Sequence, residues 1–90
     1  MPYEIEFTDT AVDDIQRLID SLPTDRRAPA LKEIEKECLA FAARPPGTTA
    51  SGDFPVHFSV DGVRYWWAGT YRISLDRAKL YVTHVFRVPL

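Results

Sequence analysis

The stretch that decides the fold is residues 54–88, which read FPVHFSV-DG-VRYWWAGTYRISL-DRA-KLYVTHVFRV. Three runs rich in Val, Ile, Phe, Tyr and Trp are separated by two short polar segments, a pattern typical of strands joined by turns. Asp61-Gly62 favours a two-residue type I′ turn, because both central positions of that turn need a positive φ. Residues 76–78 supply the second return. The stretch therefore predicts a three-stranded antiparallel meander, and the residues before it are expected to cover one of its faces.

Alternating side chains divide this meander into an apolar and a polar face, because successive residues of a strand point to opposite sides. The apolar parity holds Phe54, Val56, Phe58, Val60, Tyr71, Ile73, Leu75, Leu80, Val82, His84, Phe86 and Val88. The polar parity holds His57, Ser59, Arg72, Ser74, Tyr81, Thr83, Val85 and Arg87, and we expect function on that face. We expect His84 to be a hydrogen-bonded core histidine. Gly69 is expected to mark a bulge or a close approach of the chain.

The first half of the chain predicts one strand and two helices. Residues 3–7 alternate apolar and acidic side chains, as a strand with one buried face does. A stripe of Val12, Ile15, Ile19 and Leu22 predicts a helix over 9–21, capped by Thr8 or Thr10. A second stripe of Leu31, Ile34, Cys38 and Phe41 predicts a helix over 29–44, with Pro29 in its first turn. The alternative is one bent helix from Asp25. Pro-Pro-Gly at 45–47 is expected to stop this helix.

Bulk composition indicates one domain over residues 1–90. The chain is 46% hydrophobic and 12% aromatic, which are globular values. Its single cysteine excludes an internal disulfide and an all-cysteine metal site, and we expect no metal and no cofactor. No run approaches the ~18 apolar residues of a membrane helix and the N-terminus lacks a signal-peptide pattern, so we expect no membrane partner and a cytoplasmic location. A net charge of −2 argues against a general nucleic-acid binder, although a local basic face remains compatible with it.

The element order is therefore β-α-α-β-β-β, an α+β fold with two helices on one face of a four-stranded antiparallel sheet. This order resembles the RelE/ParE family of toxins from bacterial type II toxin–antitoxin modules. YEIEFTDTAVDDIQRL at 3–18 is similar to that family's first strand and helix, GTYRISL at 69–75 to its third-strand signature, and KLYVTHVFRV at 79–88 to its closing strand. The resemblance implies a toxin neutralised by an antitoxin encoded beside it. RelE-like members cleave mRNA on the ribosome, and ParE-like members poison DNA gyrase.

The resemblance also implies candidate catalytic residues. In RelE-like enzymes the third-strand arginine contacts the scissile phosphate, and Arg72 matches it; Arg87 is the nearest match to a basic residue late in the last strand. On the residues alone, His57 is the one histidine of the polar parity and titrates in the range of a general base, and Tyr81 has a hydroxyl to donate. The plainer alternatives are an exposed strand histidine, and surface arginines paired with carboxylates of this chain or of an antitoxin.

Three functional interpretations stay open: a RelE-like, metal-independent endoribonuclease, a ParE-like inhibitor of DNA gyrase, and a non-catalytic relative that only binds an antitoxin. RelE-like enzymes carry a Tyr or His beyond the last basic residue, whereas this sequence ends RVPL. A groove that gathers His57, Arg72, Arg87 and Tyr81 favours the ribonuclease, and scattered side chains favour the others. Cys38 is expected to be a buried apolar residue. One of the two adjacent tryptophans, 66 and 67, is expected to face outward as an antitoxin contact or a base-stacking platform.

Overall fold

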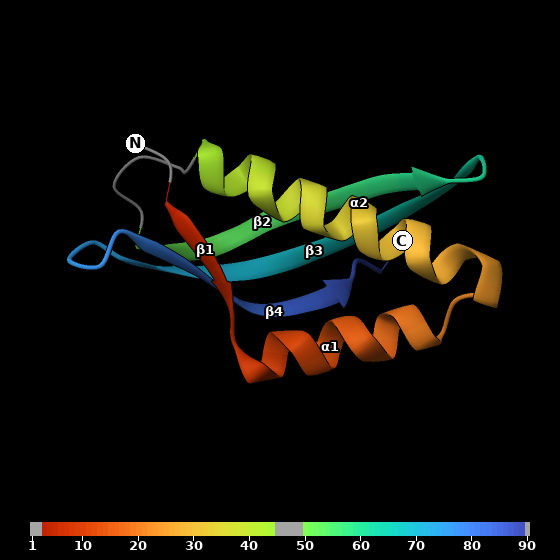
Figure 1. Cartoon of the computed structure of the whole chain (residues 1–90), viewed down its shortest axis with the longest axis horizontal. Coiled ribbons are helices and arrows are strands. Elements are labelled where there is room, and N and C mark those ends of the chain that lie inside the picture. The colour runs from red at the N-terminus through yellow and green to blue at the C-terminus, as the bar shows by residue number, and fades with distance from the viewer. Residues whose placement is uncertain (1–2, 45–49, 90) are drawn as a thin grey trace.

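The computed structural model describes residues 3–44 and 50–89 and contains two helices and four strands. In chain order the elements are β1 (Glu4–Phe7), α1 (Asp9–Asp20), α2 (Thr24–Ala43), β2 (Ser51–Val60), β3 (Val63–Ser74) and β4 (Lys79–Arg87). The predicted β-α-α-β-β-β order is confirmed (Figure 1). The Pro-Pro-Gly stop predicted at 45–47 lies outside the described residues.

The four strands form one sheet in the order β1-β4-β3-β2. Strands β2, β3 and β4 pair antiparallel, as the meander predicted, but β1 pairs parallel to β4, so the prediction of a purely antiparallel sheet is wrong. The course of the chain explains this. Strand β1 continues into α1, and α2 brings the chain back, so β2 runs in the same sense as β1 (Figure 1). The two turns of the meander then leave β4 parallel to β2, and hence to β1.

Both helices contribute to a single core on one face of the sheet, which we call the inner face. Helix α2 packs mainly against β2, α1 packs mainly against β4, and the helices make few contacts with each other. The inner-face residues predicted on β2, together with Tyr71, Ile73, Leu80 and Val82, are buried. Gly69 is a point of close approach, as predicted, because a Cβ there would lie 2.6 Å from the ring of Phe54. Leu75 is 76% exposed in the second turn, so its predicted burial is wrong.

Helix α2 begins directly after Pro23 and continues through Pro29, so the turn predicted before residue 29 is wrong and the alternative of one helix is confirmed. Pro29 has no N–H to donate to the carbonyl of Asp25, four residues earlier. Both residues are exposed, which leaves that carbonyl open to water. Helix α1 begins as predicted: the Thr8 hydroxyl accepts a hydrogen bond from the amide of Ala11 at 3.2 Å.

A register shift between β3 and β4 reverses the predicted faces of the last strand. Tyr71 pairs with Val82 but Thr70 pairs with His84, so Thr83 is the extra residue of a bulge. Beyond it, Val85 is buried and Phe86 is 41% exposed, the opposite of the prediction. His84 is exposed rather than a core histidine, and its Nδ1 lies 3.3 Å from the Asp14 carboxylate. A prediction from sequence assumes that side chains keep alternating along the whole strand. The extra residue of a bulge breaks that alternation, so the residues after it point to the opposite faces.

Candidate functional site

The candidate site lies on the sheet face away from the helices, which we call the outer face. Register places neighbouring side chains on it in rows across β2, β3 and β4, since paired residues share a face. From one end to the other, the rows are Ser59 with Arg64; His57 with Trp66; Pro55 with Ala68 and Phe86; Asp53 with Thr70 and His84; and Ser51 with Arg72 and Tyr81. Arginine and aromatic side chains thus meet at both ends of the face.

At the first end lies a group of side chains that we call the Arg64 cluster: His57, Ser59, Arg64 and Trp66. The Arg64 guanidinium carbon lies 5.1 Å from the centre of the Trp66 ring, and Nη1 donates to the Ser59 hydroxyl at 3.3 Å. The His57 ring meets the Trp66 ring edge-on, with centroids 4.6 Å apart. The Asp61-Gly62 turn, with φ of 50° and 80°, holds β2 and β3 in the register that makes these contacts. The cluster therefore combines a cation, a titratable ring and an indole that is 42% exposed.

Two hollows meet at Arg64. In one, of about 350 Å³, Arg64 lies with Arg87, Trp66 and Trp67. In the other, of about 410 Å³, Arg64 lies with His57, with residues of α2 and with Arg44, which directly follows that helix. Arg64 thus connects two residues predicted from the sequence, His57 and Arg87. However, Arg87 pairs with the buried Trp67, so it projects on the inner side of the sheet, where its guanidinium donates to the Ser21 hydroxyl. Its predicted place on the polar face is wrong, because the bulge at Thr83 precedes it.

At the other end, Arg72 and Tyr81 form a second arginine–aromatic pair. The Arg72 guanidinium carbon lies 5.6 Å from the Tyr81 ring centre, beside an open hollow of about 520 Å³ that Asp76 and Arg77 also line. The neighbouring Lys79 ammonium is 2.6 Å from a Glu6 carboxylate oxygen, a hydrogen bond that raises the pKa of Lys79. This end therefore holds cations and a phenol, but one of its cations, Lys79, is already paired with the Glu6 carboxylate.

The four residues predicted as catalytic are therefore not gathered at one place. Arg64 and Arg72 are eight positions apart on β3, and a rise of about 3.3 Å per residue separates them by roughly 26 Å. His57 and Arg87 lie toward the Arg64 end, and Tyr81 lies with Arg72. The sequence interpretation missed Arg64 because it assigned faces on this strand only from Tyr71 onward. The Asp-Gly turn was the available signal: it pairs Val60 with Val63, which places Arg64 beside Ser59.

The chemistry available at the Arg64 cluster suits a phosphodiester. A guanidinium gives paired hydrogen bonds to phosphate oxygens, an indole face stacks on a base, and an imidazole transfers protons near neutral pH. Cys38 offers no nucleophile, because burial against the inner face raises the pKa of its thiol to about 12. Among residues 3–44 and 50–89, no three His, Cys, Asp or Glu side chains gather where they would hold a metal ion. No helix in the described part of the chain is long and apolar enough to cross a membrane.

Comparisons with known proteins add evidence about the fold. No family model matches the sequence, and no curated protein matches it. The isolated RelE toxin of Escherichia coli matches in structure with a TM-score of 0.57 at 12% identity, over 98% of this chain and 86% of that one. A metal-bound toxin from Helicobacter pylori matches with a TM-score of 0.55 at 16% identity, over 94% and 93%. A chain of the toxin–antitoxin complex RelBE2 from Mycobacterium tuberculosis matches with a TM-score of 0.50 at 16% identity, over 98% and 100%.

These likenesses extend over nearly the whole chain, and at such low identity they show the fold. The chain has the α+β fold of the RelE toxins, so the resemblance predicted from the sequence is confirmed at that level.

Proposed function

We propose that this chain is the toxin of a type II toxin–antitoxin module and acts as a RelE-like, ribosome-dependent mRNA endonuclease. The observation that carries the proposal is Arg64, stacked on Trp66 between the hollow it shares with His57 and the hollow it shares with Arg87. The RelE-like fold supports the choice of toxin class. The partners implied are a cognate antitoxin protein and mRNA on the ribosome, which sets the reaction in the cytoplasm.

In the proposed reaction, a ribose 2′-OH attacks the adjacent phosphorus atom, and the bond to the 5′-oxygen of the next nucleotide breaks. His57 accepts the 2′-OH proton as general base. Arg64 stabilises the charge that grows on the phosphate oxygens in the transition state, and Arg87, which lines one hollow with Arg64, adds positive charge from the inner side of the sheet. The exposed face of Trp66 stacks on a base next to the scissile bond. The 5′-oxygen leaves and takes a proton from solvent water, so the products are a 2′,3′-cyclic phosphate and a free 5′-hydroxyl.

Arg72 and Tyr81, the other residues predicted as catalytic, are proposed as contacts to the RNA at the far end of the outer face. Their separation of roughly 26 Å from Arg64 spans several nucleotides, so they bind the strand away from the scissile bond. Arg72 pairs with a phosphate, and Tyr81 donates its hydroxyl or stacks.

The test compares two arginines of one strand that each lie over an aromatic ring. Purified protein is added to a translating extract, and mRNA cleavage is mapped by primer extension. Arg64→Ala is expected to lower the cleavage rate by about 10²–10³-fold, as the loss of one preorganised donor does. The matched control Arg72→Ala is expected to lower it less than about tenfold, through weaker binding. Wild-type protein that leaves mRNA intact in this extract contradicts the ribonuclease proposal, and a larger loss with Arg72→Ala contradicts its centre at Arg64.

A second candidate is a toxin that binds its target without catalysis, either DNA gyrase or an antitoxin alone. The observation that favours it is the division of His57, Arg72, Arg87 and Tyr81 between two ends of the sheet and two faces. Inhibition of gyrase supercoiling with intact mRNA supports the gyrase alternative. If neither mRNA cleavage nor gyrase inhibition is detected, the remaining alternative is a protein that only binds an antitoxin. Co-expression with the product of the neighbouring reading frame tests it, and a complex that co-purifies supports it.

A further inference from the structure

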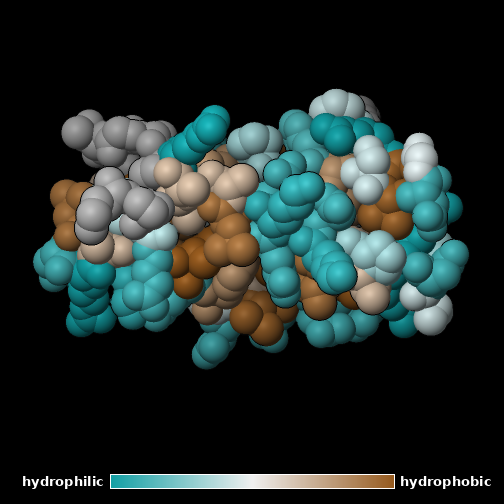
Figure 2. Space-filling model, turned by 45° about the horizontal axis from the view of Figure 1, so that its top comes forward, coloured by the Kyte–Doolittle hydropathy of each residue, from teal (hydrophilic) through white to brown (hydrophobic). Residues whose placement is uncertain are grey.

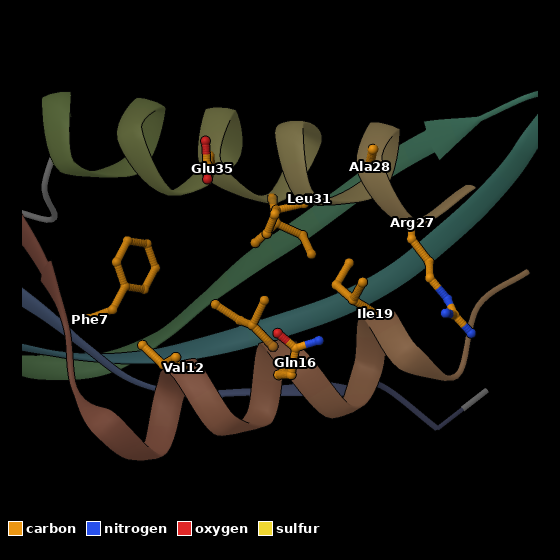
Figure 3. A pocket seen from close by; sticks show the side chains of 10 residues that line it. Phe7, Val12, Gln16, Ile19, Arg27, Ala28, Leu31 and Glu35 are labelled. Carbon is orange, nitrogen blue, oxygen red and sulfur yellow. The ribbon is translucent and has the colours of Figure 1, made fainter. Parts of the chain in front are cut away.

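A groove runs between α1 and α2 on the helix side of the molecule, opposite the outer face. It has a volume of about 350 Å³ and is lined by Phe7, Val12, Ile15, Gln16, Ile19, Arg27, Ala28, Leu31, Ile34 and Glu35. Figure 3 shows Val12 and Ile19 of α1 facing Leu31 of α2, with Phe7 toward one end and Arg27 toward the other. The groove exists because the helices pack on different strands and scarcely touch each other.

The groove leaves apolar side chains open to solvent. Val12 is 52% exposed and Leu31 is 40% exposed, although both belong to the stripes that predicted the core. Figure 2 shows hydrophobic surface of this kind emerging between hydrophilic side chains. Exposed apolar side chains that gather in a concave site mark a contact with a partner more often than scattered ones do. The groove therefore has an apolar floor that is open to solvent.

The rim of the groove is acidic. Asp9, Asp13, Gln16 and Asp20 follow the spacing i, i+4, i+7 and i+11, which aligns them along one side of α1, and Gln16 lines the groove. The opposite wall presents Glu35. The three aspartates and Glu35 are all exposed.

Basic groups near the rim do not cancel these charges. Arg27 lies at one end, and its guanidinium donates to the carbonyls of Leu22 and Asp20, each at 3.0 Å. Arg17 is paired with Asp14 on another side of α1 at 2.8 Å. Two further cations of this stretch of α2, Lys32 and Lys36, are exposed. Four carboxylates thus outnumber the nearby cations along an apolar floor.

We infer that this groove binds an amphipathic helix of a partner protein, with an apolar stripe flanked by Lys and Arg. The helical form follows from the walls. Both are helices whose backbone groups are bonded internally, so an extended segment would bury peptide groups without partners, whereas a helix satisfies its own. The basic flanks follow from the acidic rim. A second copy of this chain is a poor occupant, because its acidic rim would face the same acidic rim.

The inference stands apart from the proposed ribonuclease reaction, because the groove and the Arg64 cluster lie on opposite sides of the sheet. Only the identity of the partner protein rests on the proposed function, under which the bound helix belongs to the antitoxin. Under that function, a toxin with a net charge of −2 would be recognised by a basic segment of its antitoxin.

The test uses two synthetic helical peptides of about five turns with the same leucine stripe at i, i+3, i+4 and i+7 spacing. One has Lys and Arg flanks and the other has Glu flanks, and each binds the full chain in a fluorescence anisotropy titration. The basic peptide is expected to bind at least about tenfold more tightly, and the difference should shrink as salt screens the rim. Equal affinities, tighter binding of the acidic peptide, or no binding of either peptide would overturn the inference.

Variants locate the binding. Leu31→Glu is expected to lower the affinity for the basic peptide more than about tenfold, because it places a charge on the apolar floor. Leu39→Glu is the matched control, because Leu39 is 56% exposed on the same helix but does not line the groove. This variant is expected to bind the basic peptide as tightly as the wild type does. Asp13→Asn changes an exposed residue without threatening the fold, and is expected to narrow the preference for the basic peptide. Equal losses for Leu31→Glu and Leu39→Glu, or an unchanged preference in Asp13→Asn, contradict the site. The Leu31→Glu variant is also assayed for mRNA cleavage. It is expected to cleave like the wild type, so a failure of the groove inference can be told apart from a failure of the proposed function.

Discussion

The inner and outer faces of one sheet are built from the same strands and have opposite properties. On β2, Val56 is fully buried against the helices, while the next residue, His57, reaches the outer face and meets the Trp66 ring edge-on. Within the described residues, the inner face buries no polar or charged side chain, and the outer face carries Arg64 and Arg72 together with hydroxyls and exposed aromatic rings. The difference teaches that substitutions on one face act on stability and those on the other act on function. Each prediction below tests one side of that division.

The largest effect is expected for Leu80→Ala on the inner face. Leu80 is completely buried, so the substitution should lower the free energy of unfolding by about 2–5 kcal/mol, which combines lost burial with the cavity left behind. Chemical denaturation measures it. Leu75→Ala, in the exposed second turn, is the control and should change stability by less than about 0.5 kcal/mol. Similar losses at both positions would mean that the inner face does not hold the core.

The next effect is expected on the outer face, where the two histidines provide a matched pair. His57→Ala should lower mRNA cleavage about 10²-fold, since a positioned proton-transfer group contributes at least that much. His84→Ala should leave cleavage near wild type, because His84 pairs with Asp14 at the sheet edge, away from Arg64. Neither substitution should change the free energy of unfolding by more than about 0.5 kcal/mol. Equal activity of the two variants would remove His57 from the mechanism.

Gly69→Ala tests how closely the inner face is packed. A Cβ at this position meets the Phe54 ring at 2.6 Å, so the variant should lose about 1–3 kcal/mol of unfolding free energy through overpacking. Adding Phe54→Leu should recover part of the loss, because the smaller side chain leaves room for the methyl group. A double variant less stable than the sum of the two single changes would contradict the close approach.

Cys38 gives the inner face a pH dependence at alkaline pH. Burial raises the pKa of its thiol to about 12, so the folded state keeps a proton that the unfolded state releases above its ordinary pKa, near 9. That contribution is complete below pH 9 and is lost as the pH rises toward 12, by at most about 1.4 kcal/mol per pH unit. Comparing the wild type with Cys38→Ala at pH 7 and pH 10 measures it, and the wild type should lose more stability. Parallel losses would show that Cys38 does not titrate on unfolding.

The smallest effect is expected for Phe86→Ser. Because the bulge turns Phe86 outward, the change should lower the free energy of unfolding by no more than about 0.5 kcal/mol. If Phe86 were buried on the inner face, as the sequence predicted, the loss would be several times larger. Val85→Ser, one residue away and buried, should cost well over 1 kcal/mol by placing a hydroxyl in the core. The reverse order of the two losses would contradict the bulge.

Short-range patterns in the sequence determined most of the fold. Alternation on residues 54–60, 71–74 and 80–82 assigned the correct faces, because a strand places residues i and i+2 on one side. The Asp-Gly turn predicted the β2–β3 hairpin, and its residues have the positive φ that a type I′ turn needs. Apolar residues at helical spacing predicted both helices and the side on which they cover the sheet. These features depend on residues within about four positions of one another.

Only the tertiary structure decided what happens after Val82. Strand β1 ends at Phe7, so the edge of β4 beyond it is bonded from α1 and its cap instead. The Thr8 hydroxyl donates to the Thr83 carbonyl at 3.2 Å, and the Asp14 carboxylate accepts from the Val85 amide at 3.2 Å. These contacts join residues about 70 positions apart and accompany the bulge that turns Val85 inward and Phe86 and His84 outward.

The candidate site was divided in the same way. Sequence predicted His57, Arg72, Arg87 and Tyr81 as polar-face residues, but their mutual distances depend on strand order and register, which no local pattern contains. The strand pairing brought Arg64 into one hollow with His57 and into another with Arg87, and it separated Arg72 and Tyr81 from them along the sheet. A sequence determines which side chains a strand offers, because alternation is local. The pairing of distant strands decides which of those side chains meet, because a single bulge exchanges the two faces.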